Sequence, residues 1–223
     1  MENFLEKIDK TTGLMSKWQN VPDKHRDFLE SIRGQVIVKG KLSAAQVKWL
    51  ESLQEKYSEA SLLDAQKWMK QFDEECRINV IRLMKYYEAN PPYYGDMAAR
   101  ILADPEGFTI SADAYSKLIN NKFAKKVIAE YESEPQFLVG EMAIIRKSNK
   151  VRRLNMEEGI GLSFKESTEL DNKPVVILEV HAKPITRTAK GSKIYKVLPV
   201  GRTPVYAYES DLKKARKVKS KKS

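Results

Sequence analysis

Acidic, histidine and lysine side chains at alternate positions form the first pattern in the chain that could do chemistry. Glu179, His181 and Lys183 alternate along a predicted strand, and Asp171 precedes them. Carboxylates and a lysine on adjoining strands are the groups that metal-dependent nucleases use. The lysine falls four residues after Glu179, which is too far along the strand for that arrangement. We therefore interpret His181 as a half-buried strand residue.

The other reactive side chains also favour structural roles. Cys76 lies on the apolar face of a predicted helix, where a small core residue is more common than a nucleophile. The acidic run at residues 73–75 opens that helix, and carboxylates at this end stabilise the helix dipole. One cysteine and two histidines, His25 and His181, are too few for an ordinary zinc site. We expect no enzymatic activity, no metal and no cofactor.

Binding of an anion is the chemistry that the charge distribution favours. Residues 1–135 hold 20 Lys and Arg against 21 Asp and Glu, a net charge of −1. Residues 136–223 hold 20 against 9, a net charge of +11. Because the excess is concentrated in one half, it predicts a polyanionic partner. The alternative is that the basic end of the chain only keeps the protein soluble.

The candidate phosphate-binding residues are cations in three segments: the predicted loop 146–153, the predicted loop 186–193 and the tail 211–223. Like charges in one loop repel each other, and an anionic partner relieves that repulsion. Each loop alone is equally well explained as a solvated turn. The candidates are Arg146, Lys147, Lys150, Arg152 and Arg153, then Arg187, Lys190 and Lys193, and finally Lys213, Lys214, Arg216, Lys217, Lys219, Lys221 and Lys222.

Short strands must position the first two of these segments. The predicted strands are β-branched and aromatic, and Gly, Pro, Asn, Asp and Ser separate them, which is typical of a small closed barrel or sandwich. They lie at residues 137–146, 174–181, 193–200 and 204–208.

Helical periodicity dominates the amino-terminal half. Residues 2–19 form a short helix or an arm; further helices are predicted at 24–39, from 43, at 62–69, 73–88 and 96–102, and from 111 as one long helix or two helices broken near 120. Asp23 is a candidate cap, Ser43 with Gln46 forms a capping box, and Gly40 ends the preceding helix. Tyrosines around Pro91 and Pro92 either pack across the turn or form a platform for stacking bases.

Two regions of the chain resemble known protein families. The strand from Phe137 to Arg146, the segment Lys196–Gly201 and the closing Val205–Leu212 resemble SH3-like barrels of the kind found in KOW-type modules. That resemblance implies binding of nucleic acid, of ribosomal or transcription complexes, or of peptides. Residues 40–50 are similar to proteins of large tailed phages, which implies a phage-encoded chain.

The sequence thus predicts an α+β protein with a helical domain at 1–135, an SH3-like β-barrel at 136–210 and a flexible basic tail at 211–223. We expect a non-enzymatic, nucleic-acid-associated protein, binding DNA or RNA through the phosphate backbone. The alternatives are a protein-binding adaptor or inhibitor that docks on a transcription or replication complex through its helical domain, and a structural virion component. Without a signal-like start or an apolar span, we expect a cytoplasmic protein with no membrane partner.

Overall fold

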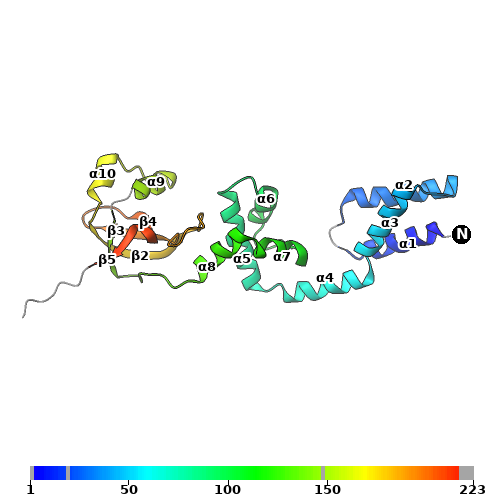
Figure 1. The fold of residues 1–223 in the computed structure, drawn as a ribbon, viewed down its shortest axis with the longest axis horizontal. Coiled ribbons are helices and arrows are strands. Elements are labelled where there is room, and N and C mark those ends of the chain that lie inside the picture. Colours follow the sequence, from blue (N-terminus) through cyan, green and yellow to red (C-terminus); the bar gives the residue numbers. More distant parts are fainter. Residues whose placement is uncertain (1–2, 19–20, 147–148, 216–223) are drawn as a thin grey trace, which may run out of the picture. The chain divides into compact units, whose positions relative to one another are not determined.

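A computed structural model describes residues 3–18, 21–146 and 149–215 of the chain. Within these ranges the chain forms helices and a five-stranded antiparallel sheet, so the predicted α+β class is confirmed at that level (Figure 1). The chain divides into two compact units, Met1–Asp73 and Glu74–Ser223.

The first unit is helical, and its core lies among its first three helices. Its described helices are α1 (Phe4–Met15), α2 (Asp23–Lys39), α3 (Ala44–Lys56) and α4 (Glu59–Gln71). Leu29 and Ile32 of α2 pack with Leu50 and Leu53 of α3 and with Ile8 of α1 in one buried cluster. Helices α2 and α3 therefore pack as a helical hairpin with a shared core. Helix α4 has no buried residue.

The ends of α2 and α3 follow local rules. Gly40 has φ 65°, and its amide donates to the Val36 carbonyl at 2.8 Å, so it ends α2 as predicted. The Ser43–Gln46 capping box at the start of α3 is also confirmed. The prediction for Asp23 is wrong: Asp23 is the first residue of α2, and Pro22 precedes it without a side-chain cap.

Four helices form the first part of the second unit, and Asn121 separates the last two. They are α5 (Glu74–Glu88), α6 (Gly95–Ala103), α7 (Ala112–Asn120) and α8 (Lys122–Glu132). Of the two alternatives left open by the sequence, the broken helix is the one observed. Asn121 has extended backbone, and its Oδ1 accepts from the amides of Phe123 and Ala124, which starts α8.

The tyrosines at the end of α5 pack as structural residues. Tyr86 and Tyr87 are buried, and the Tyr87 ring lies 4.7 Å from that of Tyr94. Asn121 donates from Nδ2 to the Tyr87 hydroxyl at 2.7 Å. Packing across the prolyl turn is therefore the arrangement found, and Tyr93 is the one of these four rings that stays mainly exposed.

The sheet has the order β4-β3-β2-β1-β5, all pairs being antiparallel. Its strands are β1 (Met142–Ile145), β2 (Pro174–Lys183), β3 (Ile194–Pro199), β4 (Val205–Tyr208) and β5 (Leu212–Lys214), with a short 3-10 helix, Glu209–Asp211, before β5. The predicted strand at 137–146 is shorter than expected. Phe137 precedes the strand and is buried edge-on against Tyr195.

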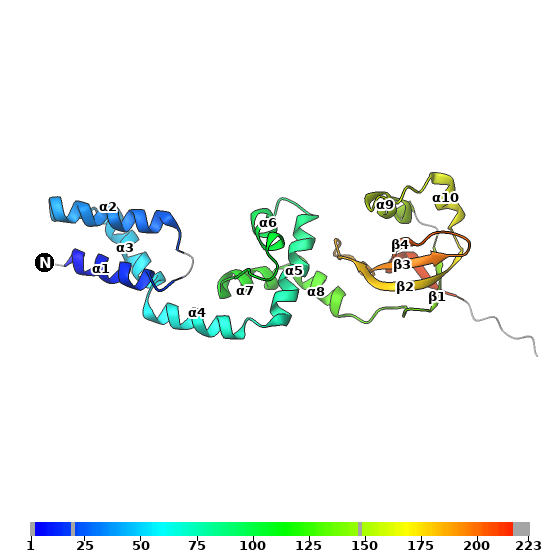
Figure 2. The same ribbon diagram turned by 180° about the vertical axis from the view of Figure 1, so that it is seen from behind.

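Two helices in the β1–β2 connection replace the loop predicted at 146–153. They are α9 (Asn149–Glu157) and α10 (Phe164–Glu169), and both lie on the same side of the sheet (Figure 2). Helix α9 forms because Val151 and Leu154 bury one face of it. Ser163 and Glu166 form a capping box that starts α10.

The end of α8 is attached to the sheet within the second unit. The Ile185 amide donates to the Tyr131 hydroxyl at 2.9 Å, and the Tyr131 ring stacks on His181 at 5.5 Å. The Gln136 amide donates to Oε2 of Glu209 at 3.2 Å. The change from helix to strand near residue 135 therefore falls inside one compact unit.

Candidate nucleic-acid interface

Three of the predicted cations lie where β1 pairs with β5. Lys213 lies opposite Ile144 and Lys214 opposite Ala143. Arg146 follows β1 and donates from its backbone amide to the Asp211 carbonyl at 2.7 Å and from Nε to the Leu212 carbonyl at 3.0 Å. Arg146, Lys213 and Lys214 thus lie at one edge of the sheet, with Lys213 and Lys214 on opposite faces because successive strand residues alternate. We call these three residues the edge cluster.

A second pair of cations lies on α9. Arg153 is exposed, and its Nε donates to Oε1 of Glu157 at 2.8 Å. Arg152 is half-buried, and its Nε donates to the Leu162 carbonyl at 3.3 Å, which connects α9 to the segment before α10. Exposed ion pairs such as Arg153–Glu157 contribute little stability, so an anion can compete for the arginine.

The segment 186–193 contributes fewer accessible cations than predicted. Lys190 is exposed. The Arg187 guanidinium lies 4.1 Å from the centre of the Tyr208 ring, a cation–π contact that holds it against β4. Gly191 has φ 73°, and a Cβ there would lie 3.0 Å from the Ser210 amide nitrogen, so glycine serves close packing of this turn.

Lys193 does not belong to the candidate interface. Its side chain is 0% exposed, and Nζ lies 3.7 Å from Oε1 of Glu130 and contacts the hydroxyl of Ser133. A buried lysine needs a charge partner inside the protein, and Glu130 provides it. The prediction that Lys193 contacts phosphate is wrong for this reason.

Several predicted residues cannot be placed. Lys150 is part of α9, but its side chain is not among those described. The others lie outside the described residues: Lys147, Arg216, Lys217, Lys219, Lys221 and Lys222.

The alternating acidic, histidine and lysine pattern is broken in the fold. His181 has φ 54°, and the pairing of β2 with β3 shifts register between Glu179 and Lys183. Lys183 forms an ion pair with Glu158 and lies 5.2 Å from the centre of the Tyr206 ring. Burial lowers the pKa of His181, which is half-buried as predicted. In the part of the chain that the structure describes, no cluster of metal-ligating side chains is found.

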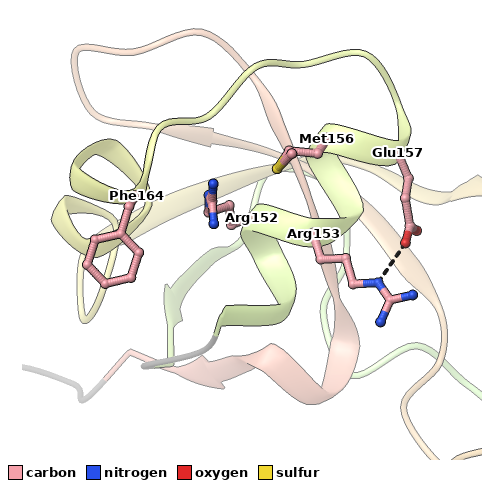
Figure 3. Close-up of a pocket in the computed structure, with 5 residues that line it drawn as sticks. All are labelled: Arg152, Arg153, Met156, Glu157 and Phe164. Atoms are coloured by element: carbon pink, nitrogen blue, oxygen red, sulfur yellow. Dashed lines mark hydrogen bonds and ion pairs between the residues drawn. The ribbon is translucent and has the colours of Figure 1, made fainter.

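The sequence reasoning missed a surface depression between α9 and α10. Figure 3 shows its lining residues, Arg152, Arg153, Met156, Glu157 and Phe164, around a volume of about 490 Å³. Phe164 is 66% exposed and Met156 is 54% exposed. The available signal was the Ser163–Glu166 capping pattern, which places Phe164 at the first position of a helix.

Comparison with models of known protein families, with curated proteins and with solved structures finds no significant match to the chain. Among the described residues, no helix combines the length and the apolar character needed to cross a bilayer.

Proposed function

We propose that the chain is a non-enzymatic protein that binds nucleic acid by contacting the phosphate backbone through its basic carboxyl-terminal half. The observation that carries the proposal is the edge cluster. Arg146, Lys213 and Lys214 lie at the β1–β5 edge of the sheet, and residues 216–222 of the tail add five further cations in the sequence. Cations concentrated at one edge of a domain can neutralise neighbouring phosphates, whereas a merely solubilising charge needs no such concentration.

The strand arrangement supports the narrower proposal of an SH3-like barrel. Strand β2 pairs with both β1 and β3, and its pairing with β3 shifts register on both sides of Glu179. A 3-10 turn joins β4 to β5, and β5 returns to pair with β1. This is the connectivity expected of an SH3-like module. We also propose that the protein is phage-encoded and cytoplasmic.

Salt-dependent binding tests the function. Duplex DNA, single-stranded DNA and RNA are titrated with the full chain at about 50 mM and 200 mM salt. Replacing Arg146, Lys213 and Lys214 by Gln should reduce the slope of log affinity against log salt by up to about 2.7 on duplex DNA, at about 0.9 per phosphate contact. The matched control replaces Lys125 and Lys126, exposed on α8, and should leave the slope unchanged. Equal slopes in all three proteins would contradict the proposal.

A protein-binding adaptor is the second candidate, and the outer face of the sheet favours it. Met142, Val176 and Leu198 are cross-strand neighbours in one row, and Met142 is 55% exposed. Val200, just beyond β3, is 80% exposed. Contiguous exposed apolar side chains mark protein-binding surfaces. Binding of a purified transcription or replication complex that Leu198→Lys abolishes, without any affinity for nucleic acid, would favour this candidate.

A further inference from the structure

The depression between α9 and α10 has one aromatic wall and one cationic wall. Figure 3 shows the Phe164 ring on one side, Met156 on α9 across from it, and the Arg152 guanidinium between them. Arg153 and Glu157 point away and bond to each other at 2.8 Å. The volume of about 490 Å³ falls within the range of small-ligand sites.

The residues around Phe164 in the sequence do not prevent a side chain of this segment from being buried. The same segment places Leu170 in the core of the sheet and packs Leu162 against it, while Phe164 keeps 66% of its surface exposed. An exposed aromatic ring beside an arginine offers two flat surfaces, and nucleobases stack on both kinds. Met156 adds a flexible apolar contact on the opposite side.

The surrounding charges complement phosphates. Arg152 and Arg153 are among the residues that line the depression. The carboxylates nearby are occupied. Glu166 accepts from the Ser163 amide at 2.8 Å at the start of α10, and Glu157, Glu158 and Glu169 are in ion pairs. A base in the depression would therefore have the Arg152 guanidinium beside it, and Arg153 at the rim, for its flanking phosphates.

We propose that this depression binds one unstacked nucleobase, so that single-stranded nucleic acid is the preferred ligand. The inference rests on the proposed function and adds the strand type to it. Bases of a duplex are stacked inside the helix and cannot reach a ring that lies in a concave site. Phosphate contacts at the edge cluster bind single strands and duplexes alike, whereas stacking on Phe164 is available only to the bases of a single strand.

An abasic oligonucleotide separates base stacking from phosphate binding. The full-length protein is titrated by fluorescence anisotropy with a strand of about 20 thymidines, an abasic strand of the same length and a duplex of that length. We expect the thymidine strand to bind more tightly than the abasic strand. Phe164→Ala should weaken binding of the thymidine strand by about 5- to 150-fold and leave the abasic strand and the duplex unchanged. Phe164→Trp should retain the preference.

Phe123→Ala is the matched control, because Phe123 is 48% exposed on α8 of the same unit. It should bind all three probes like the unmodified protein. Equal affinity of the unmodified protein for thymidine and abasic strands, or a Phe164→Ala variant that keeps the preference, overturns the inference and leaves phosphate binding intact. Failure of the unmodified protein to bind any probe overturns both proposals.

Discussion

Lys193 and Glu130 form an ion pair inside the second unit, with 3.7 Å between Nζ and Oε1, although the lysine side chain is completely buried. The pair connects the residue before β3 with the last turn of α8. Glu130 also accepts from the Ser192 amide at 3.0 Å, and Lys193 contacts the Ser133 hydroxyl. The lysine that the sequence assigns to a polyanion therefore joins helix to sheet.

Breaking this ion pair should destabilise the protein strongly. Glu130, whose side chain is 12% exposed in the unmodified protein, loses its cation in Lys193→Ala, which should cost about 3–5 kcal/mol of unfolding free energy. Urea denaturation measures the loss. Lys190→Ala, at an exposed lysine in the same segment, should change stability by less than about 0.5 kcal/mol and serves as the control. Equal stabilities of the two variants would mean that the pair contributes nothing.

The core of the first unit should depend on Leu50. This side chain is 1% exposed in the cluster formed by α1, α2 and α3. Leu50→Ala should lower the unfolding free energy by about 2–5 kcal/mol, through lost burial and the cavity left behind. Leu63→Ala on α4, where the leucine is 56% exposed, should cost less than about 0.5 kcal/mol. A small loss for Leu50→Ala would place this face in solvent and favour the adaptor.

Stability of the second unit should fall at mildly acidic pH because of His181. Burial, reinforced by the charges of Lys193 and Arg82 and opposed by Glu209 and Glu130, lowers the pKa of His181 below 6.5. The unfolded chain then takes up a proton at higher pH than the folded chain, so the unfolding free energy decreases as pH falls through 6.5.

His181→Asn removes this titrating group, and asparagine tolerates the φ of 54° better than most residues. Denaturation of the second unit at several pH values should show a weaker pH dependence in the variant. Burial also lowers the pKa of His25, which lies in the first unit. Because His25 is present in both proteins, it does not contribute to the difference between them. A pH dependence of the second unit that is identical in the two proteins would rule out His181 as its source.

Limited proteolysis should cut the chain first near Asp73, where the two compact units meet in sequence. The junction at 133–136, which the change of periodicity and charge favours, is held by the bond from the Gln136 amide to Glu209 and by burial of Phe137. We expect a stable fragment that starts near Glu74. A stable fragment that starts near Gln136 instead would support the predicted division at residue 135.

Features set by neighbouring residues were predictable, and features set by distant contacts were not. The Ser43–Gln46 box and the Gly40 stop follow from local hydrogen bonds and backbone freedom, so the sequence identifies them. Helix α9 depends on the sheet: Asn155 donates from Nδ2 to the Tyr206 carbonyl and accepts from the Tyr206 amide, both at 2.8 Å. A segment as basic as this one resembles a loop until that contact is known.

The candidate site likewise contains features that the sequence predicts and features that depend on distant contacts. Arg146, Lys213 and Lys214 were predicted individually, but only the β1–β5 pairing brings them together. Lys193 was assigned to the interface because cations surround it in sequence, whereas its partner Glu130 lies on α8. The Ser163–Glu166 capping pattern marks the start of the helix that carries Phe164, but no sequence pattern indicates that its ring is exposed.

Truncation after Ala215 should weaken nucleic-acid binding without harming the fold. The cut removes five cations of the tail and keeps β5, whose residues Leu212–Lys214 pair with β1. If each removed cation contacts a phosphate of duplex DNA, the slope of log affinity against log salt should decrease by up to about 4.5, similarly for all sequences. A longer truncation that also removes β5 should unfold part of the sheet, so thermal denaturation distinguishes lost contacts from lost structure. An unchanged slope at low salt, where surface charges act most strongly, would exclude the tail from the interface and leave the edge cluster to account for binding alone.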